Sequence, residues 1–325
     1  MRETSNLREI GGTGIRISPV AMGCWPIAGM TSLDVNEADS LATLNAAFEA
    51  GVNFYDTAYC YGIDGLSERL IAQAFRGRRK KIVIATKCGL HWKSPTERIH
   101  DARPVTLRRE CEESLRRLQC DYVDLLYLHA HDGVTPLAET AAELKRLQVE
   151  GKTKSVGVSN LSLVQTQEFH AVCPLAAVQP PYNMLQREIE ADLLPWCRER
   201  NVSVIVYWPL LKGLLAGQLP RDFQFRPGDG RAKYPMFQGQ EWTKNQDLID
   251  ELRAIAGDLG KTVAQLVVNW TIQQPGITAA LCGAKRDHQI RETAGGMGWQ
   301  MQSEAYQRIE AALSRRGTPA SQRAV

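Results

Sequence analysis

The stretch FYDTAYCYG, residues 54–62, joins a short run of β-favouring residues to an aspartate, a tyrosine and a glycine. The residues VNFYD (52–56) are predicted to form a strand that ends at Asp56. The segment NEADSLATLNAAFEAG (36–51) comes before that strand, has helical length and ends at a glycine, as many helices do. A helix-length segment next to a short strand is the unit from which the fold can be predicted.

The same alternation recurs along the chain. The predicted strands are residues 19–24, 52–56, 82–87, 122–129, 154–159, 175–179, 202–208 and 277–283. Segments of helical periodicity separate most of them. Eight strand and helix units predict an α/β protein with a closed parallel barrel, the (β/α)8 or TIM barrel fold.

Three segments depart from this pattern. LREIGGTGIRIS (7–18) is predicted to form an N-terminal β-hairpin that closes the bottom of the barrel. Residues 218–245 are rich in proline and glycine, which predicts a long loop after strand 7. The basic C-terminal segment 314–325 is predicted to fray. Because no low-complexity linker divides the chain, residues 1–325 are predicted to form a single domain.

Composition narrows the class of protein. The 39 basic and 36 acidic residues give a net charge of +3, too small an excess to indicate nucleic acid or an anionic membrane as a partner. No run of about 18 apolar residues is present, so no membrane span is expected. Eight cysteines without a CxxC pair argue against a zinc knuckle or a disulfide scaffold and favour a reducing cytoplasm.

Four polar side chains are predicted at one rim of the barrel. Asp56, Lys87 and His129 end three consecutive strands, and Tyr61 follows Asp56 in the next loop. The carboxyl ends of barrel strands converge on one face, where the chemistry of such folds takes place. A phenol has a pKa near 10, so we expect Lys87 to lower the pKa of Tyr61 and Asp56 to keep Lys87 cationic. Together they form a proton-transfer unit, with His129 placed to hydrogen-bond a substrate oxygen.

Other residues near this rim have two interpretations each. His131 and Asp132 in HAHD suggest a metal site, but no third ligand follows at a recognisable spacing, so no metal is expected. Trp25, Trp92 and Trp208 are predicted at strand ends or in rim loops. They line the substrate pocket in one interpretation and pack in the core in the other.

Seven segments in order carry a resemblance to the aldo-keto reductases over nearly the whole chain. They are DTAYCYGIDGLSE (56–68), ATKCG (85–89), DLLYLH (124–129), GVSN (157–160), VQPPYN (178–183), YWPLLKGLLAG (207–217) and GAKRDHQIRET (283–293). The resemblance implies reduction of an aldehyde or ketone by NADPH, or the reverse oxidation of an alcohol or sugar, without a metal. It also implies that Tyr61 donates the proton, that Lys87 and Asp56 tune it, and that His129 orients the carbonyl.

The resemblance further implies a nucleotide site. The nicotinamide would meet Ser159, Asn160, Gln179 and the ring of Tyr207. The pyrophosphate would follow the next loop, at Pro209, Leu210, Gly213, Leu214 and Gly217. The adenosine end would meet Gly283, Lys285, Arg286, Gln289 and Glu292. Thr293 stands where the family often has asparagine, which weakens the assignment of adenine recognition.

The preference for NADPH over NADH has its own argument. Lys285 and Arg286 are predicted at a helix N-terminus, where their charges add to the partial positive charge of the helix end. A 2′-phosphate is well held by such cations. The alternative is that both are solvated turn residues.

Two other functions stay open on the sequence. A Schiff-base lyase would use Lys87 as its nucleophile on the same barrel. A nucleotide-sensing or regulatory subunit would bind NADP(H) without rapid turnover. The substrate, a small carbonyl compound or sugar, is not named by the sequence, and neither is the oligomeric state.

Overall fold

The computed structural model describes residues 7–30 and 32–320. Parallel strands close into a barrel in the order β10, β11, β12, β3, β4, β5, β8, β9. Their bounds are β3 (Val20–Gly23), β4 (Phe54–Asp56), β5 (Val83–Cys88), β8 (Leu125–Leu128), β9 (Val156–Ser159), β10 (Ala177–Gln179), β11 (Ser203–Tyr207) and β12 (Ile277–Gly283). Each of the eight predicted strands is confirmed, inside its predicted range or one residue beyond it.

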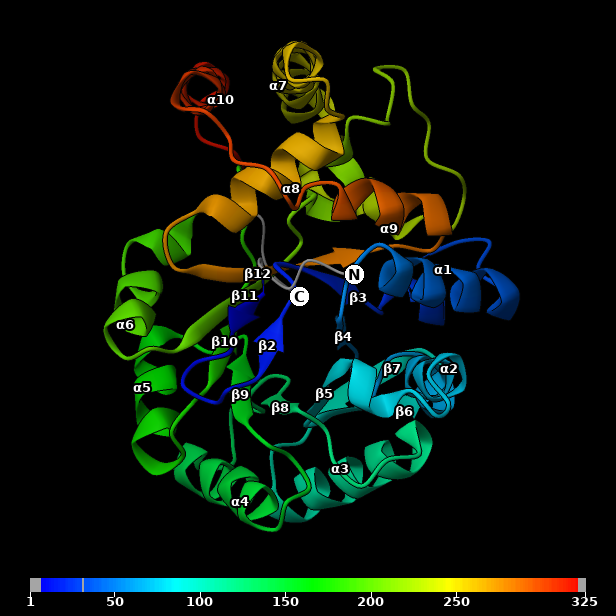
Figure 1. Ribbon diagram of the computed structural model, residues 1–325, viewed down its shortest axis with the longest axis vertical. Coiled ribbons are helices and arrows are strands. Elements are labelled where there is room, and N and C mark those ends of the chain that lie inside the picture. The colour runs from blue at the N-terminus through cyan, green and yellow to red at the C-terminus, as the bar shows by residue number, and fades with distance from the viewer. Residues whose placement is uncertain (1–6, 31, 321–325) are drawn as a thin grey trace.

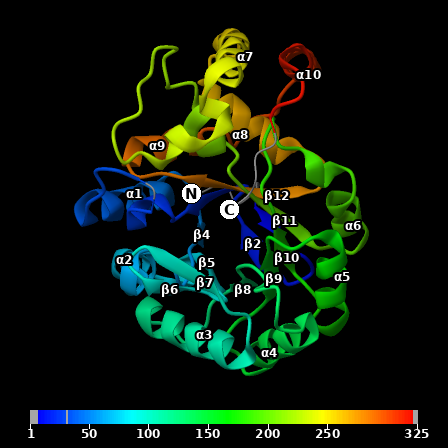
Figure 2. The same ribbon diagram turned by 180° about the vertical axis from the view of Figure 1, so that it is seen from behind.

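Helices surround the barrel, as Figure 1 shows in a view down its axis. The ring consists of α1 (Glu37–Glu49), α2 (Leu66–Ala74), α3 (Pro104–Leu118), α4 (Leu137–Val149), α5 (Leu163–Val172), α6 (Leu193–Glu199), α8 (Val263–Gln273) and α9 (Asp287–Ala294). Two further helices, α7 (Gly239–Asp258) and α10 (Ser303–Arg316), pack against each other outside α8 (Figure 2). Within the described residues, no helix combines the length and the apolar character needed to cross a lipid bilayer.

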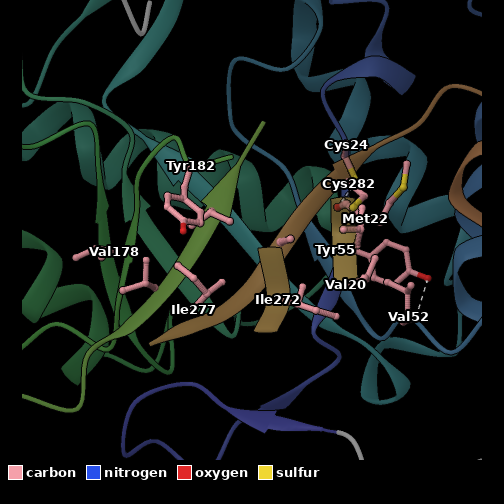
Figure 3. Close-up of a cluster of buried hydrophobic side chains, with 14 of the residues drawn as sticks. Val20, Met22, Cys24, Val52, Tyr55, Val178, Tyr182, Ile272, Ile277 and Cys282 are labelled. Atoms are coloured by element: carbon pink, nitrogen blue, oxygen red, sulfur yellow. Dashed lines mark hydrogen bonds between the residues drawn. The ribbon is translucent and has the colours of Figure 1, made fainter. Parts of the chain in front are cut away.

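Alternation along the strands divides the core into two layers. Phe54 points into the barrel and lies in one cluster with Tyr127 and Ile205. Its neighbour Tyr55 points outward and packs between the strands and the helices. Figure 3 shows part of this outer layer, in which Met22 and other side chains lie around β3 and β12. Opposite faces for successive residues are what a strand dictates.

The N-terminal hairpin closes one end of the barrel, as predicted. β1 (Arg8–Glu9) pairs antiparallel with β2 (Arg16–Ile17). Ile10 and Ile17 are fully buried and join the cluster inside the barrel. The backbone N–H of Gly11 donates to Oγ of Ser203 at 2.8 Å, which ties the hairpin to β11.

Two predicted boundaries were wrong. The irregular loop after β11 ends earlier than residue 245, because α7 begins at Gly239, and its first residues, GQEWTKN (239–245), contain a single apolar side chain, Trp242, and so no apolar periodicity. The segment 314–325 does not fray from residue 314. Arg316 ends α10 with a buried side chain that pairs with Glu241 and donates to Oδ1 of Asn245 at 3.0 Å. Residues 321–325 lie outside the described part of the chain.

One hairpin was not predicted at all. β6 (Leu90–Ser94) and β7 (Glu97–His100) pair antiparallel within the connection between β5 and α3. Trp92 lies opposite Arg98 in this pairing. The hairpin is short and its turn contains Pro95, so its alternation was hidden by turn-forming residues.

Candidate active site

A buried ion pair lies at the carboxyl ends of β4 and β5. Nζ of Lys87 is 2.5 Å from Oδ1 of Asp56, and both side chains are almost completely buried. The same ammonium donates to the carbonyl oxygen of Thr57 at 2.8 Å. Neighbouring parallel strands bring the two residues together, since Asp56 pairs with Ala85 in the barrel register.

Tyr61 joins this pair from the loop after β4. Nζ of Lys87 donates to Oη of Tyr61 at 3.3 Å. The ring of Trp25 packs edge-on against the ring of Tyr61 with centroids 5.0 Å apart, and the imidazole of His129 lies 5.8 Å from it. The structure therefore brings together all four residues predicted at the rim.

The pKa of Tyr61 differs from the sequence-based expectation. Burial raises the pKa of this phenol well above its ordinary value, and the charge of Asp56 raises it further. We expected Lys87 to lower it. Loss of water around the phenol outweighs the ammonium 3.3 Å away. Tyr61 thus keeps its proton at neutral pH.

His129 is also neutral. Burial lowers the pKa of this imidazole well below its ordinary value, and the charges of Lys87 and Arg98 add to the effect. Its Nδ1 lies 3.7 Å from Sγ of Cys60. A neutral imidazole has one N–H and one acceptor nitrogen, so it can donate a single hydrogen bond.

The residues expected around the nicotinamide form a connected network. Nε2 of Gln179 donates to Oδ2 of Asp56 at 2.8 Å, and Oγ of Ser159 donates to the carbonyl of Gln179 at 2.8 Å. Nδ2 of Asn160 donates to the carbonyl of His129 at 3.0 Å, and Oη of Tyr207 donates to Oδ1 of Asn160 at 2.8 Å. Burial raises the pKa of Asp56, while Lys87 and Gln179 oppose that rise. Gln179 is therefore a partner of the ion pair, a role that the sequence did not reveal.

The loop after β11 has an unusual backbone. Trp208, Leu211 and Lys212 have φ values of 59°, 42° and 57°, in the left-handed region that non-glycine residues avoid. Strain of this kind concentrates at binding sites. Nζ of Lys212 lies 3.5 Å from the centroid of the Trp208 ring and 4.4 Å from that of Tyr234. Burial, with a contribution from Lys233, lowers the pKa of Lys212 to about 8.

The residues assigned to the pyrophosphate lie along this strained loop. Leu214 and its neighbours form the 3-10 helix Leu211–Ala216, and the Leu214 side chain is buried in the core. Gly213 has a φ of 91°. Packing also requires a glycine at position 217, because a Cβ at Gly217 would lie 2.9 Å from Cβ of Val263. Pro209 and Leu210 precede this 3-10 helix.

The residues assigned to the adenosine end gather at the N-terminus of α9. Oε1 of Gln289 accepts from the backbone N–H groups of Lys285 and Arg286, at 3.0 and 3.2 Å. Nζ of Lys285 donates to the carbonyl of Leu33 at 2.9 Å, and Arg286 donates to that of Asp34 at 2.8 Å. The two cations thus lie at a helix N-terminus, as predicted, and also hold the loop before α1.

Three neighbours complete this end. Gly283 is exposed at the end of β12, where a Cβ would come within 3.0 Å of Pro26. Glu292 lies half-buried further along α9. Thr293 is buried, and its hydroxyl donates to the carbonyl of Gln289 at 3.1 Å, so it is turned into its own helix.

The three tryptophans separate into two groups. Trp25 and Trp92 both lie over the site: Trp25 packs on Tyr61, and Nε1 of Trp92 donates to the carbonyl of Cys60 at 2.8 Å. The ring of Trp208 instead contacts Tyr207 and Lys212.

Arg98 was not predicted from the sequence to lie at this site. Its guanidinium carbon lies 5.3 Å from the ring centroid of Trp25 and 5.4 Å from that of Trp92. Pairing across the turn at Pro95 would have placed Arg98 opposite Trp92, had the hairpin been recognised.

His131 and Asp132 serve the loop that contains them. Oδ1 of Asp132 accepts from the backbone N–H of Thr135 at 2.8 Å, and Nε2 of His131 lies 2.6 Å from the carbonyl of Thr135. Among residues 7–30 and 32–320, no group of three or more histidine, cysteine, aspartate or glutamate side chains is placed to hold a metal ion.

The sequence and the fold of this chain are similar to those of known proteins. The model of the Aldo/keto reductase family matches residues 19–314. The chain belongs to the aldo/keto reductase family. Members are oxidoreductases that act on carbonyl compounds with nicotinamide cofactors.

Individual relatives cover nearly the whole chain. Aldo-keto reductase YhdN of Bacillus subtilis is 36% identical over 94% of this chain and 92% of its own length. The NADH-specific methylglyoxal reductase of Escherichia coli is 32% identical over 89% of this chain and 92% of its own. The structure of the glycerol dehydrogenase AKR11B4 from Gluconobacter oxydans has a TM-score of 0.90 and 34% identity and covers 99% of both chains. Because one relative is named for NADH and another as a dehydrogenase, family membership alone leaves cofactor and direction open.

Proposed function

We propose that this aldo/keto reductase transfers a hydride from NADPH to the carbonyl carbon of an aldehyde or ketone, or runs the reverse oxidation of an alcohol or sugar. One observation carries the proposal. Nζ of Lys87 contacts both Oδ1 of Asp56 and Oη of Tyr61, at 2.5 and 3.3 Å, in a buried position at the strand ends.

The bound cofactor would supply the hydride, and the protein handles the proton. Tyr61 is neutral and donates its proton to the carbonyl oxygen as negative charge develops there. The phenolate that forms lies beside the ammonium of Lys87, which Asp56 in turn neutralises. The imidazole of His129, also neutral, donates a second hydrogen bond that orients the carbonyl.

NADPH fits the residues present. The nicotinamide would be held by Ser159, Asn160, Gln179 and Tyr207, whose hydrogen bonds connect them to the catalytic centre. The strained loop around Lys212 suits the pyrophosphate because it carries a desolvated cation. Lys285 and Arg286 would hold the 2′-phosphate at the N-terminus of α9.

Two alternatives make different demands. A Schiff-base lyase needs an unprotonated amine on Lys87, which the contact with Asp56 opposes. A sensor subunit needs cofactor binding without turnover, and the proton relay around Tyr61 would then have no use. A reducing cytoplasm is part of the proposal, supported by the free thiols of the eight cysteines.

A panel of aldehydes, ketones, sugars and alcohols tests the proposal by the absorbance of NADPH. Tyr61→Phe should lower turnover by at least about a hundredfold and change the Kd for NADPH by less than about twofold, since only the transferable proton is lost. Retention of more than about a tenth of turnover would exclude Tyr61 as the proton donor. Turnover below about 0.01 per second on every compound, with tight NADPH binding, would favour the sensor. Borohydride trapping of an adduct on Lys87 would favour the lyase.

A further inference from the structure

The hairpin β6–β7 places a cation over the catalytic centre. The guanidinium of Arg98 lies against the rings of Trp25 and Trp92, at 5.3 and 5.4 Å from their centroids. Trp25 packs edge-on against Tyr61, and Trp92 donates to the backbone of Cys60. Arg98 is therefore one aromatic ring away from the phenol that donates the proton.

Arg98 has no carboxylate partner within 4.0 Å in the described part of the chain, whereas Lys87, Lys93 and Arg103 each have one. Arg103 pairs with Asp101, and Arg117 pairs with Glu68. On the hairpin itself, Glu97 pairs with Lys93 and not with Arg98. A half-buried guanidinium that has five N–H donors, contacts two aromatic rings and a thiol, and has no carboxylate partner has hydrogen-bonding capacity left.

Other charges near Arg98 have partners of their own. Asp56 and Lys87 cancel each other as an ion pair. Burial and the charge of Arg98 lower the pKa of both His129 and His100, and the charge of Asp132 opposes this shift at His100. The carboxylate of Glu110 contacts His91 and accepts from the backbone N–H of Gly89. A substrate that reaches the rings of Trp25 and Trp92 therefore meets the guanidinium of Arg98, which within the described residues has no carboxylate at 4.0 Å or closer.

We propose that Arg98 binds an anionic group of the substrate, namely a carboxylate. The substrates of the reduction are then carbonyl compounds that bear a carboxylate, and those of the reverse oxidation are hydroxy acids. A guanidinium binds a carboxylate through two parallel N–H···O bonds, which fixes the orientation of the substrate as well as its affinity. The aromatic rings at its side restrict the side chain and keep water away from the contact. This inference rests on the proposed function and narrows its substrate class.

Matched substrates test it. We expect the wild-type enzyme to favour 4-oxobutanoate over its neutral methyl ester at least tenfold in kcat/KM. Arg98→Met keeps a long apolar stem between the rings and removes the charge. It should lower kcat/KM for 4-oxobutanoate at least tenfold and for the ester less than threefold. For Arg98→Lys, kcat/KM for 4-oxobutanoate should lie between the values of the wild type and of Arg98→Met.

Controls separate charge from structure. Lys93→Met removes an exposed cation of the same hairpin and should leave kcat/KM unchanged for both substrates. Raising NaCl from 0.05 to 0.5 M should lower kcat/KM for 4-oxobutanoate and leave kcat/KM for the ester unchanged. Glyceraldehyde 3-phosphate against glyceraldehyde shows whether a phosphate serves as well as a carboxylate. A larger preference for the phosphate would overturn the assignment of a carboxylate.

Binding without turnover keeps this test independent of the proposed function. Succinate, which has no carbonyl to reduce, should quench the fluorescence of Trp25 and Trp92 with a Kd at least tenfold lower than succinamide. Arg98→Met should abolish the difference. The proposal is overturned if the wild type binds succinate and succinamide with equal affinity. It is also overturned if Arg98→Met lowers kcat/KM equally for 4-oxobutanoate and its ester. Absence of turnover with succinate binding intact overturns only the proposed function.

Discussion

Sγ of Cys60 lies 3.7 Å from Nδ1 of His129, inside the catalytic centre. Burial raises the pKa of the Cys60 thiol to about 12, so the thiol carries its hydrogen. Burial also keeps the imidazole neutral by lowering the pKa of His129. An S–H that donates to Nδ1 leaves the imidazole hydrogen on Nε2, from which it can be donated to a carbonyl oxygen.

Cys60→Ala should therefore shift His129 toward a mixture of tautomers and lower kcat by about twofold, since a hydrogen bond of about 1 kcal/mol selects the tautomer and an even mixture keeps half of the imidazoles productive. Cys60→Ser keeps a donor and should retain most of kcat. Nitrogen-15 chemical shifts of labelled histidine report the tautomer directly. The backbone carbonyl that holds Trp92 is unchanged in both variants. Identical histidine shifts in wild type and Cys60→Ala would contradict this role.

The ion pair of Asp56 and Lys87 should show strong coupling in stability. Lys87→Met leaves a buried carboxylate without its cation, which should cost about 3–5 kcal/mol in the free energy of unfolding. Adding Asp56→Asn removes that charge while its amide oxygen can still accept from Gln179. We expect the double variant to be more stable than Lys87→Met in urea unfolding. Additive losses would show that the two charges do not interact. Both variants should lose activity.

The choice of nicotinamide cofactor can be tested at α9. Replacement of both Lys285 and Arg286 by alanine should raise the Kd for NADPH at least about tenfold, because charge-assisted hydrogen bonds contribute about 1.5–3 kcal/mol each. The Kd for NADH should change less than about threefold. Arg291→Ala is the matched control, since Arg291 lies on the same helix, is exposed and pairs with Glu49. Fluorescence titration of each variant with NADPH and NADH measures these Kd values. An equal rise in the Kd for both cofactors would mean that Lys285 and Arg286 do not bind the 2′-phosphate.

Glu110 should make stability depend on pH. Its buried carboxylate oxygens lie 2.7 Å from the N–H of Gly89 and 2.7 Å from Nδ1 of His91. An ion pair would lower the pKa of the acid and raise that of His91, yet burial raises the pKa of Glu110 to about 7 and lowers that of His91. Burial therefore dominates, and the pair holds one proton. The folded protein keeps a proton on Glu110 that the unfolded chain releases at lower pH, so the contribution of Glu110 to stability falls as pH rises to about 7, while the lowered pKa of His91 acts in the opposite direction.

Comparison with Glu110→Gln isolates this effect. Between pH 5.5 and 8.5 the wild type should lose on the order of 2 kcal/mol of unfolding free energy relative to the variant. The glutamine oxygen can still accept from Gly89. Urea unfolding at the two pH values measures the change. A constant difference between the two proteins would mean that Glu110 is ionised throughout.

Two glycines should respond to alanine in opposite directions. A Cβ at Gly157 would lie 2.5 Å from the Tyr127 ring and 2.8 Å from the backbone oxygen of Ala177. Gly157→Ala should therefore cost about 1–3 kcal/mol. Gly257 lies within α7 with nothing near its Cβ position, so Gly257→Ala should add about 0.5–1 kcal/mol. Thermal unfolding compares the two, and a neutral Gly157→Ala would show that the barrel interior adjusts freely.

The sequence by itself determined the eight strands, the three polar residues at the ends of consecutive strands and Tyr61 in the loop after the first of them. A strand is recognisable locally from β-branched runs bounded by turn residues, and in a parallel barrel every strand ends on the same face. Asp56, Lys87 and His129 could therefore be placed together before any coordinates were known. The helix N-terminus beside Lys285 and Arg286 was predictable for the same reason.

Only the tertiary structure decided which groups touch and which lose their water. Arg98 reaches Trp25 because a short hairpin folds over the rim, and no local pattern marks that approach. Arg316, near the start of the basic C-terminal segment, is buried because α10 packs on α7. The direction of the pKa shift of Tyr61 followed from burial outweighing a neighbouring charge, a balance that exists only after the barrel has closed.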